Sequence, residues 1–158
     1  MSRKILPWSV FLLLIFVLSS PLVLAKAMQP AGQVIAAGAG VKAKAKSGAV
    51  RVLKRRSKVY QGDTIITGRS TAQIRFSDGS LTALRPRTKF KIVSFRWRGK
   101  QDGSERGIFS LLKGGLRTIS GSIGKRHRNH YQMRTPVATI GIRGTSYFLR
   151  LLKRRLTG

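Results

Sequence analysis

The chain has 158 residues, which suggests one domain, and its 32 Lys and Arg residues face only 4 Asp and Glu, for a formal net charge of +28. So few carboxylates leave little material for acid–base catalysis or a hard-cation site, and the lack of Cys excludes disulfides and thiolate metal sites. The charge predicts attraction to an anion, such as nucleic acid, anionic lipid, lipopolysaccharide or an acidic protein; the alternative is that part of it only keeps the surface soluble.

The first 27 residues are typical of a secretory signal peptide. Arg3 and Lys4 form a positive start, an apolar run follows over residues 10–18, and Ala25-Lys26-Ala27 is a small-residue cleavage pattern. We expect cleavage after Ala27 and a periplasmic location. The alternative is an uncleaved helix that anchors the chain in the inner membrane. Export disfavours nucleic acid as the partner, because chromosomal DNA and ribosomal RNA stay in the cytoplasm.

The segment that follows the signal peptide is low in complexity. Ala, Gly and Lys alternate over residues 28–47, and we expect a flexible arm or a first strand there. Residues 48–52 alternate as a short strand does, and a basic loop follows it.

Residues 62–81 carry the clearest strand and turn signals in the chain. Gly62-Asp63 and Asp78-Gly79 mark two turns, because Asp and Gly tolerate the backbone angles that tight turns demand. Between them Ala72, Ile74 and Phe76 share one side of an alternating segment, which predicts a half-buried strand. The four acids lie in or near such turn signals, so we interpret Asp63 and Asp78 as turn formers rather than catalytic acids.

The next stretch predicts a break, a strand with an irregularity and a polar loop. Residues 85–88 include a proline, which cannot donate to a central ladder. The apolar alternation then slips near Val93-Ser94, which indicates a bulge or a bend. Arg96 and Arg98 flank Trp97, as in a nucleic-acid stacking platform, but outward arginines beside an inward aromatic are favoured. Residues 99–107 read as a polar loop that carries Asp102 and Glu105.

Residues 108–130 contain no pattern that predicts a ligand site. The apolar segment 108–112 ends at Gly114-Gly115, and residues 121–125 lack the residues that a phosphate loop requires. His127 and His130 are the only histidines, and with neither Cys nor a nearby carboxylate they read as solvated loop residues. We expect the basic run 125–128 to be an exposed turn.

Residues 135–145 form a second distinctive block. Thr135-Pro136 opens it, and we expect Gly141 and Gly144-Thr145 to frame a turn around Arg143. Arg143 is interpreted as bonding backbone carbonyls or capping a turn; the alternative is that it binds a ligand. A last strand is expected over residues 147–151.

In their order and spacing these segments resemble the FecR family of periplasmic domains over about residues 48–148. The resemblance rests on residues 50–52, 62–68, 74–81, 115–117 and, above all, 135–145. It implies an all-β domain without catalysis that acts by protein contact outside the cytoplasm. The best-known members sense occupied outer-membrane iron transporters and regulate an extracytoplasmic sigma factor.

The chain departs from the pattern of those regulators at both ends. They carry a cytoplasmic sigma-binding region before a spanning helix, whereas only about six residues precede the apolar run here, so the signalling role is not expected to carry over. Family members usually continue with further strands after the last block. We expect residues 149–158 to be a basic tail of a truncated or altered chain, which would leave an open strand edge.

Together these readings predict an all-β fold: a single small domain of short, mainly antiparallel strands, arranged as a sandwich or a β-roll and preceded by a signal-peptide helix. The family motif residues Gly62, Asp63, Asp78, Gly79, Thr135, Pro136, Gly141, Arg143, Gly144 and Thr145 are expected to be structural. The expected function is non-enzymatic, with no cofactor or metal, and its partner is an envelope protein. The alternative is a basic polyanion binder, with lipopolysaccharide, nucleic acid or an anionic membrane surface as the partner.

Overall fold

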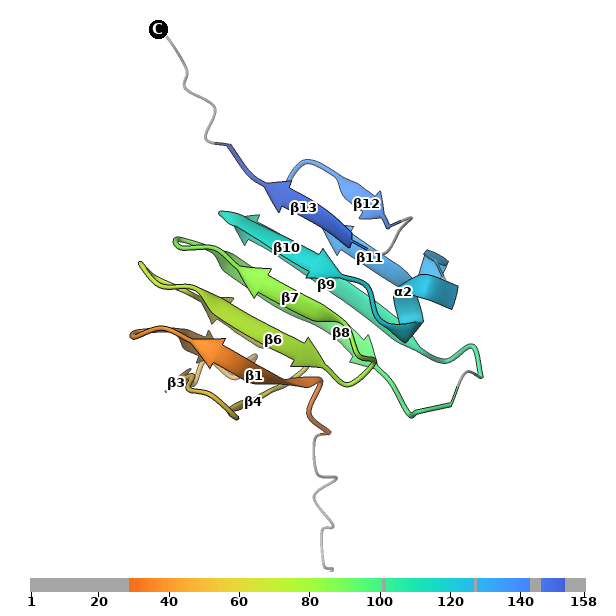
Figure 1. The fold of residues 1–158 in the computed structure, drawn as a ribbon, viewed down its shortest axis with the longest axis horizontal. Coiled ribbons are helices and arrows are strands. Elements are labelled where there is room, and N and C mark those ends of the chain that lie inside the picture. The colour runs from red at the N-terminus through yellow and green to blue at the C-terminus, as the bar shows by residue number, and fades with distance from the viewer. Residues whose placement is uncertain (1–28, 101, 127, 143–145, 153–158) are drawn as a thin grey trace, which may run out of the picture.

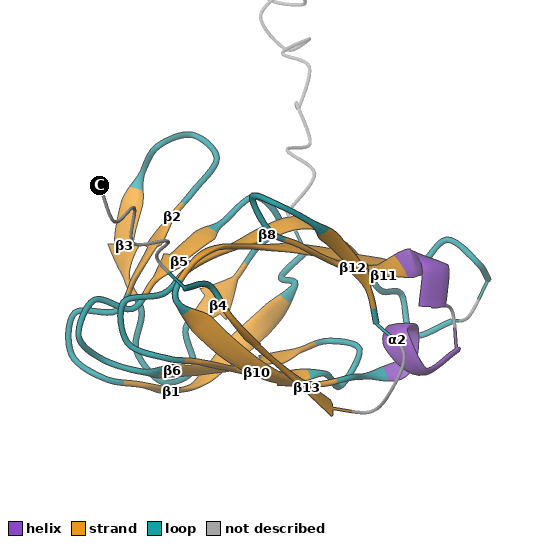
Figure 2. Ribbon diagram, turned by 90° about the horizontal axis from the view of Figure 1, so that it is seen from above, coloured by secondary structure: helices purple, strands orange, loops and turns teal. Residues whose placement is uncertain are grey.

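The computed structural model describes residues 29–100, 102–126, 128–142 and 146–152. The predicted signal peptide, residues 1–27, lies outside these residues. The described chain forms two facing β-sheets, one with six strands and one with seven, with a short helix at one end (Figures 1 and 2). We name them the β6 sheet and the β8 sheet after a member of each. The prediction of an all-β domain with mainly antiparallel strands is confirmed.

The strands of the β6 sheet are, in spatial order, β13 (Ser146–Arg150), β10 (Gly115–Ile119), β7 (Leu81–Leu84), β6 (Ala72–Phe76), β1 (Gly32–Ala37) and β4 (Lys58–Val59). The strands of the β8 sheet are, in spatial order, β12 (Thr139–Gly141), β11 (Tyr131–Arg134), β9 (Arg106–Lys113), β8 (Lys89–Arg96), β5 (Thr64–Ile66), β2 (Lys42–Lys44) and β3 (Val50–Val52).

The chain passes repeatedly between the two sheets. The hairpins β2–β3, β6–β7, β8–β9 and β11–β12 each stay within one sheet. Other connections change sheet; Gly114 alone separates β9 from β10. Strands β1 and β2 come from the low-complexity segment 28–47 and lie in different sheets. Each contributes a fully buried residue to the core, Val34 from β1 and Ala43 from β2.

The core between the sheets is built by alternation along each strand. In β6 the buried residues are Ala72, Ile74 and Phe76, while Gln73 and Arg75 are exposed, as the two-residue period predicts. The ring of Phe109 joins the sheets: its centroid lies 4.9 Å from Phe76 of the β6 sheet and 5.6 Å from Phe90 of its own sheet. Packed aromatic pairs of this kind stabilise a core beyond the area that they bury.

Two irregularities follow the sequence signals. The β8–β9 register shifts between Ile92 and Ser94, which confirms the expected bulge and turns Phe95 and Trp97 toward the core. Strand β7 ends at Leu84 and β8 begins at Lys89, so residues 85–88 do break the ladder.

Two expectations for the polar segments were wrong. The basic run was expected to be a turn, but Lys125 and Arg126 end a short helix, α2 (Ser122–Arg126), and Arg128–His130 form a 3-10 turn. Lys125 and Arg126 are exposed as expected, while α2 buries Ile123 and Gly124. Glu105 was placed in a polar loop, but it is 2% exposed, just before β9. Strand β9 begins at Arg106, earlier than the apolar run suggests, and it draws Glu105 inside.

Candidate functional site

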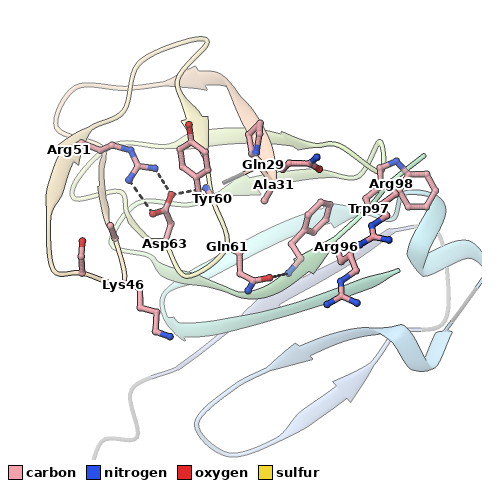
Figure 3. A pocket seen from close by; sticks show the side chains of 14 residues that line it. Gln29, Ala31, Lys46, Arg51, Tyr60, Gln61, Asp63, Arg96, Trp97 and Arg98 are labelled. Carbon is pink, nitrogen blue, oxygen red and sulfur yellow. Dashed lines mark hydrogen bonds and ion pairs between the residues drawn. The ribbon is translucent and has the colours of Figure 1, made fainter. Parts of the chain in front are cut away.

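A cleft of about 700 Å³ opens beside the β2–β3 hairpin, the β4–β5 turn and the end of β8 (Figure 3). Its lining combines cations with aromatic rings and contains a single acid: Gln29, Pro30, Ala31, Ala45, Lys46, Ser47, Arg51, Tyr60, Gln61, Asp63, Phe95, Arg96, Trp97 and Arg98. Concave sites lined by apolar surface with a few convergent polar groups are the usual places for ligand binding. The cleft is therefore the candidate functional site.

An ion pair between Arg51 and Asp63 forms one wall of the cleft (Figure 3). Arg51 Nη1 donates to Asp63 Oδ1 at 3.1 Å, and Arg51 Nη2 pairs with Asp63 Oδ2. This two-point geometry is the strong form of an arginine–carboxylate contact. The backbone N–H of Tyr60 also donates to Asp63 Oδ2 at 2.8 Å, so the buried carboxylate is well supplied with donors.

The guanidinium of Arg51 is held from two further sides. Its Nη2 also donates to the carbonyl of Lys58 at 3.3 Å, and its Cζ lies 5.4 Å from the centroid of the Tyr60 ring. Such a position over an aromatic face adds a cation–π attraction. Arg51 thus joins strand β3 to the β4–β5 segment, and it neutralises the acid of the cleft.

The opposite wall is the distal part of β8. Gln61 Oε1 accepts a hydrogen bond from the backbone N–H of Phe95 at 2.9 Å, which ties β8 to the β4–β5 turn. Phe95 and Trp97 are half-buried against the core, whereas Arg96 and Arg98 are exposed at the rim. The predicted arrangement of inward aromatics and outward arginines is present, and both kinds of side chain line the cleft.

The turn residues predicted from the sequence lie at two corners of the domain. Gly62 and Gly79 have φ angles of 90° and 84°, which L side chains rarely adopt. Asp78 Oδ1 accepts hydrogen bonds from the N–H of Ser80 at 3.0 Å and from its hydroxyl at 2.6 Å, inside the β6–β7 turn. Asp63 lies in the cleft, whereas Asp78 lies under α2, where its carbonyl accepts from the N–H of Ser122.

The second motif block forms the β11–β12 hairpin. Thr135 Oγ1 accepts from the N–H of Ala138 at 3.0 Å, and Pro136 is exposed within that turn. Gly141 is the last residue of β12. The turn that it was expected to frame around Arg143 extends beyond the described residues, so that expectation stays a prediction. The other motif residues, Arg143, Gly144 and Thr145, lie outside the described residues.

A buried hydroxyl cluster lies between the sheets, away from the cleft. The Tyr131 and Tyr147 hydroxyls are 3.2 Å apart, and those of Thr82 and Thr118 are 3.0 Å apart. Burial raises the pKa of Tyr131 well above its ordinary value, and burial also raises the pKa of Tyr147. Both phenols are therefore neutral hydrogen-bonding groups at physiological pH.

Among the described residues, no group of three or more His, Cys, Asp and Glu side chains is placed to hold a metal ion. His130 is partly buried, and His127 lies outside the described residues. The described helices are all too short or too polar to cross a membrane.

A comparison with protein-family models matches residues 63–157 to the family described as FecR protein. This match covers more than half of the chain. The chain belongs to the FecR family. Neither a curated protein nor a solved structure matches it. The FecR match begins at Asp63, so it includes one partner of the ion pair in the cleft; the other partner, Arg51, precedes it.

Sequence reasoning missed the cleft and the role of Arg51. The one available signal was a single charge between two valines in Val50-Arg51-Val52. In the structure the valines are 59% and 55% exposed, and Arg51 turns toward Asp63. The usual rule of apolar inside and charged outside is therefore reversed in β3, because this strand lies at the sheet edge, beyond the covered core.

Proposed function

We propose that this FecR domain is a non-catalytic binding domain exported to the periplasm, and that its cleft holds an acidic, partly apolar segment of an envelope protein. The lining of the cleft supports this most directly. Its one acid is neutralised by Arg51, while Lys46, Arg96 and Arg98 have exposed side chains around Tyr60 and Trp97. A carboxylate-bearing segment with an apolar side chain matches both features.

The residue types of the cleft favour a protein partner. Trp, Tyr and Arg dominate the energetic centres of protein interfaces, because they bury much area and still make directed polar contacts. Trp97, Tyr60 and Arg51 are also held in place by neighbours before any partner arrives. Side chains that are already positioned lose less conformational entropy on binding.

The acids have structural surroundings that argue against a catalytic role. Asp63 is bound to Arg51 and Tyr60, and Asp78 to Ser80, while Asp102 accepts from the N–H of Ser104 in an exposed loop. Glu105 is buried and does not line the cleft. The chain also has no Cys. A nucleophile–base pair of the kind that covalent catalysis needs is absent from the lining of the cleft.

The proposed location rests on the sequence of residues 1–27, which is typical of a cleaved signal peptide. Export would place the cleft among envelope proteins rather than nucleic acids. Amino-terminal sequencing of the protein recovered from the periplasm should give a start at Met28. A start at Met1 would instead support membrane anchoring.

A crosslinking experiment in cells tests the cleft. A photoreactive amino acid replaces Ser47, an exposed residue of the lining. We expect a discrete adduct with an envelope protein, joined through a peptide that contains Asp or Glu. The double variant Lys46→Glu/Arg98→Glu should lose that adduct, because it reverses the charge of the rim. The matched control is Arg55→Glu/Arg69→Glu, which reverses two exposed charges outside the lining and should keep the adduct.

Equal loss of the adduct in both double variants would show that only the net charge matters for binding. Adducts only with lipid or nucleic acid would overturn the assignment of a protein partner.

Binding of an anionic envelope surface is the second candidate function, and the outer face of the β8 sheet favours it.

A further inference from the structure

The outer face of the β8 sheet carries two rows of side chains that run across the strands. The pairing registers align the first row as Val52, Lys42, Ile66, Lys89 and Lys113, and the second as Val50, Lys44, Thr64, Lys91, Ser110 and Arg134. The five lysines are all exposed. We call this surface, defined by Lys42, Lys44, Lys89, Lys91 and Lys113, the lysine face.

Like charges meet directly across the β8–β9 strand pair, which carries part of the lysine face. Lys89 lies opposite Lys113, and further along the same strand pair Arg96 lies opposite Arg106. Cross-strand pairs of like charge destabilise a sheet. Lysines often protect the edges of sheets from aggregation, but β8 is the central strand of its sheet, with three strands on each side. Edge protection therefore does not account for Lys89 and Lys91.

The chain does not place an acid on these rows to relieve the repulsion. Its four acids lie elsewhere: Asp63 in the cleft, Asp78 beneath α2, Asp102 in the β8–β9 loop and Glu105 inside the domain. A concentrated positive surface without internal counter-charges is complementary to an anionic one.

We infer that the lysine face docks on the anionic surface of a lipid bilayer. The rows present long, flexible ammonium groups, and at their β3 end the exposed Val50 and Val52 share the same face. Lysine stems with charged tips and small apolar side chains suit the interface between lipid headgroups and acyl chains. The rows contain no aromatic residue on which the bases or sugars of a soluble polyanion could stack. This surface is distinct from the proposed protein-binding cleft.

Vesicle co-sedimentation tests the inference. The exported protein is mixed with vesicles of phosphatidylglycerol and phosphatidylcholine, or of phosphatidylcholine alone. We expect binding only to the anionic vesicles, and loss of that binding as salt shortens the Debye length. Each basic residue near such a surface adds affinity, so Lys89→Gln/Lys91→Gln should weaken binding about 25-fold.

The matched control removes two charges from the opposite side of the domain. This control is Arg75→Gln/Arg117→Gln. Arg75 and Arg117 lie on the outer face of the β6 sheet, where both side chains are exposed. Facing sheets pack about 10 Å apart, beyond the Debye length of about 8 Å at physiological salt, so this control should change binding less than about twofold. All three proteins have the same amino terminus, so any lipid affinity of that segment is common to them.

Equal weakening by the two double variants would overturn the inference, because net charge alone would then explain the binding. Failure to sediment with anionic vesicles, or equal sedimentation with both kinds, would also overturn it. The same would follow if DNA or an acidic polysaccharide bound the protein more tightly than the vesicles and lost that binding in Lys89→Gln/Lys91→Gln.

Discussion

The cleft and the lysine face are both basic, but their charges stand in opposite surroundings. In the cleft, Arg51 contacts a buried carboxylate, a carbonyl and an aromatic ring. On the lysine face, Lys89 lies opposite another lysine, and the two rows contain no acid. A positive charge thus holds the fold together in one region and works against it in the other.

This difference shows that the net charge of the chain is not one property with one role. The presence of a charge that stabilises the fold needs no further reason, because its removal would lower the stability of the domain. Charges that destabilise it need a different reason, since stability is commonly given up where a surface serves a function. Substitutions that remove a single charge from each region should therefore have opposite effects on stability.

The largest expected effect is the unfolding of the whole domain, which would abolish both the cleft and the lysine face because they share one core. Ile74→Asp places a carboxylate at a fully buried position of the β6 sheet. The cost of burying an unpaired charge is comparable to the roughly 5–15 kcal/mol by which a folded domain is stable, so the variant should not fold. We expect loss of strand content and of the melting transition by circular dichroism. Gln73→Asp, on the exposed side of the same strand, should fold normally. A cooperative melt of Ile74→Asp at the wild-type temperature would show that the inner face is misassigned.

Arg51→Ala should destabilise the domain by about 2 kcal/mol, because the carboxylate of Asp63 stays buried with fewer donors. The value lies at the low end for a buried pair, since the Arg51 side chain is 36% exposed. Urea unfolding followed by tryptophan fluorescence measures the change. Lys54→Ala, which removes an exposed charge from the following loop, serves as the control. Identical unfolding midpoints for Arg51→Ala and the control would contradict a structural role for the ion pair.

Alkaline pH tests the contribution of the two buried tyrosines. Because burial raises the pKa of Tyr131 and of Tyr147, the folded state keeps both protons at a pH where the unfolded state, near its ordinary value of about 10, releases them. Their contribution is complete below about pH 10 and is lost as pH rises further, by roughly 1.4 kcal/mol per pH unit for each group.

Melting curves between pH 8 and about pH 11 isolate the tyrosine effect when wild type is compared with Tyr131→Phe/Tyr147→Phe. The double variant should lose less stability with rising pH, because it lacks the two buried phenols whose protons the unfolded state of the wild type releases. Parallel pH profiles for the two proteins would show that the tyrosines do not carry the alkaline transition.

The smallest expected effect is a gain in stability. Lys89→Gln removes one member of the like-charge pair with Lys113 and should stabilise the domain by about 0.5 kcal/mol, with the gain shrinking at high salt. Arg117→Gln is the control, because Arg117 lies opposite the uncharged Ala83 and Phe148. If Lys89→Gln destabilises the domain as much as Arg51→Ala does, the claim that the charges of the two regions have opposite effects on stability is contradicted.

Local sequence signals predicted much of the fold. The alternation in Ala72–Phe76 gave the buried and exposed sides of β6, and the slip near Val93-Ser94 marked the bulge in β8. The turn at Asp78-Gly79 and a strand near the end of the described chain, β13, were also found. These features depend on near neighbours along the chain, so their causes are visible in the sequence.

The features that were missed depend on which strands become neighbours. Arg51 and Asp63 meet because β2 lies between β3 and β5, a strand order that no local pattern gives. The lysine face likewise requires β2, β5, β8 and β9 to align, although β2 and β8 each show only two exposed lysines, β9 shows one and β5 has none. The parallel pairing of β9 with β11 depends on the chain returning through α2.

One reciprocal measurement tests most directly whether the two basic regions act separately. Lys46→Glu/Arg98→Glu in the cleft and Lys89→Gln/Lys91→Gln on the lysine face are each examined for crosslinking through position 47 and for binding to anionic vesicles. We expect the cleft variant to lose the protein adduct while it keeps most of its vesicle binding. The lysine-face variant should show the reverse. If each variant loses both activities in proportion to the charge that it removes, the basic residues act as one diffuse field and the division into two functional surfaces is contradicted.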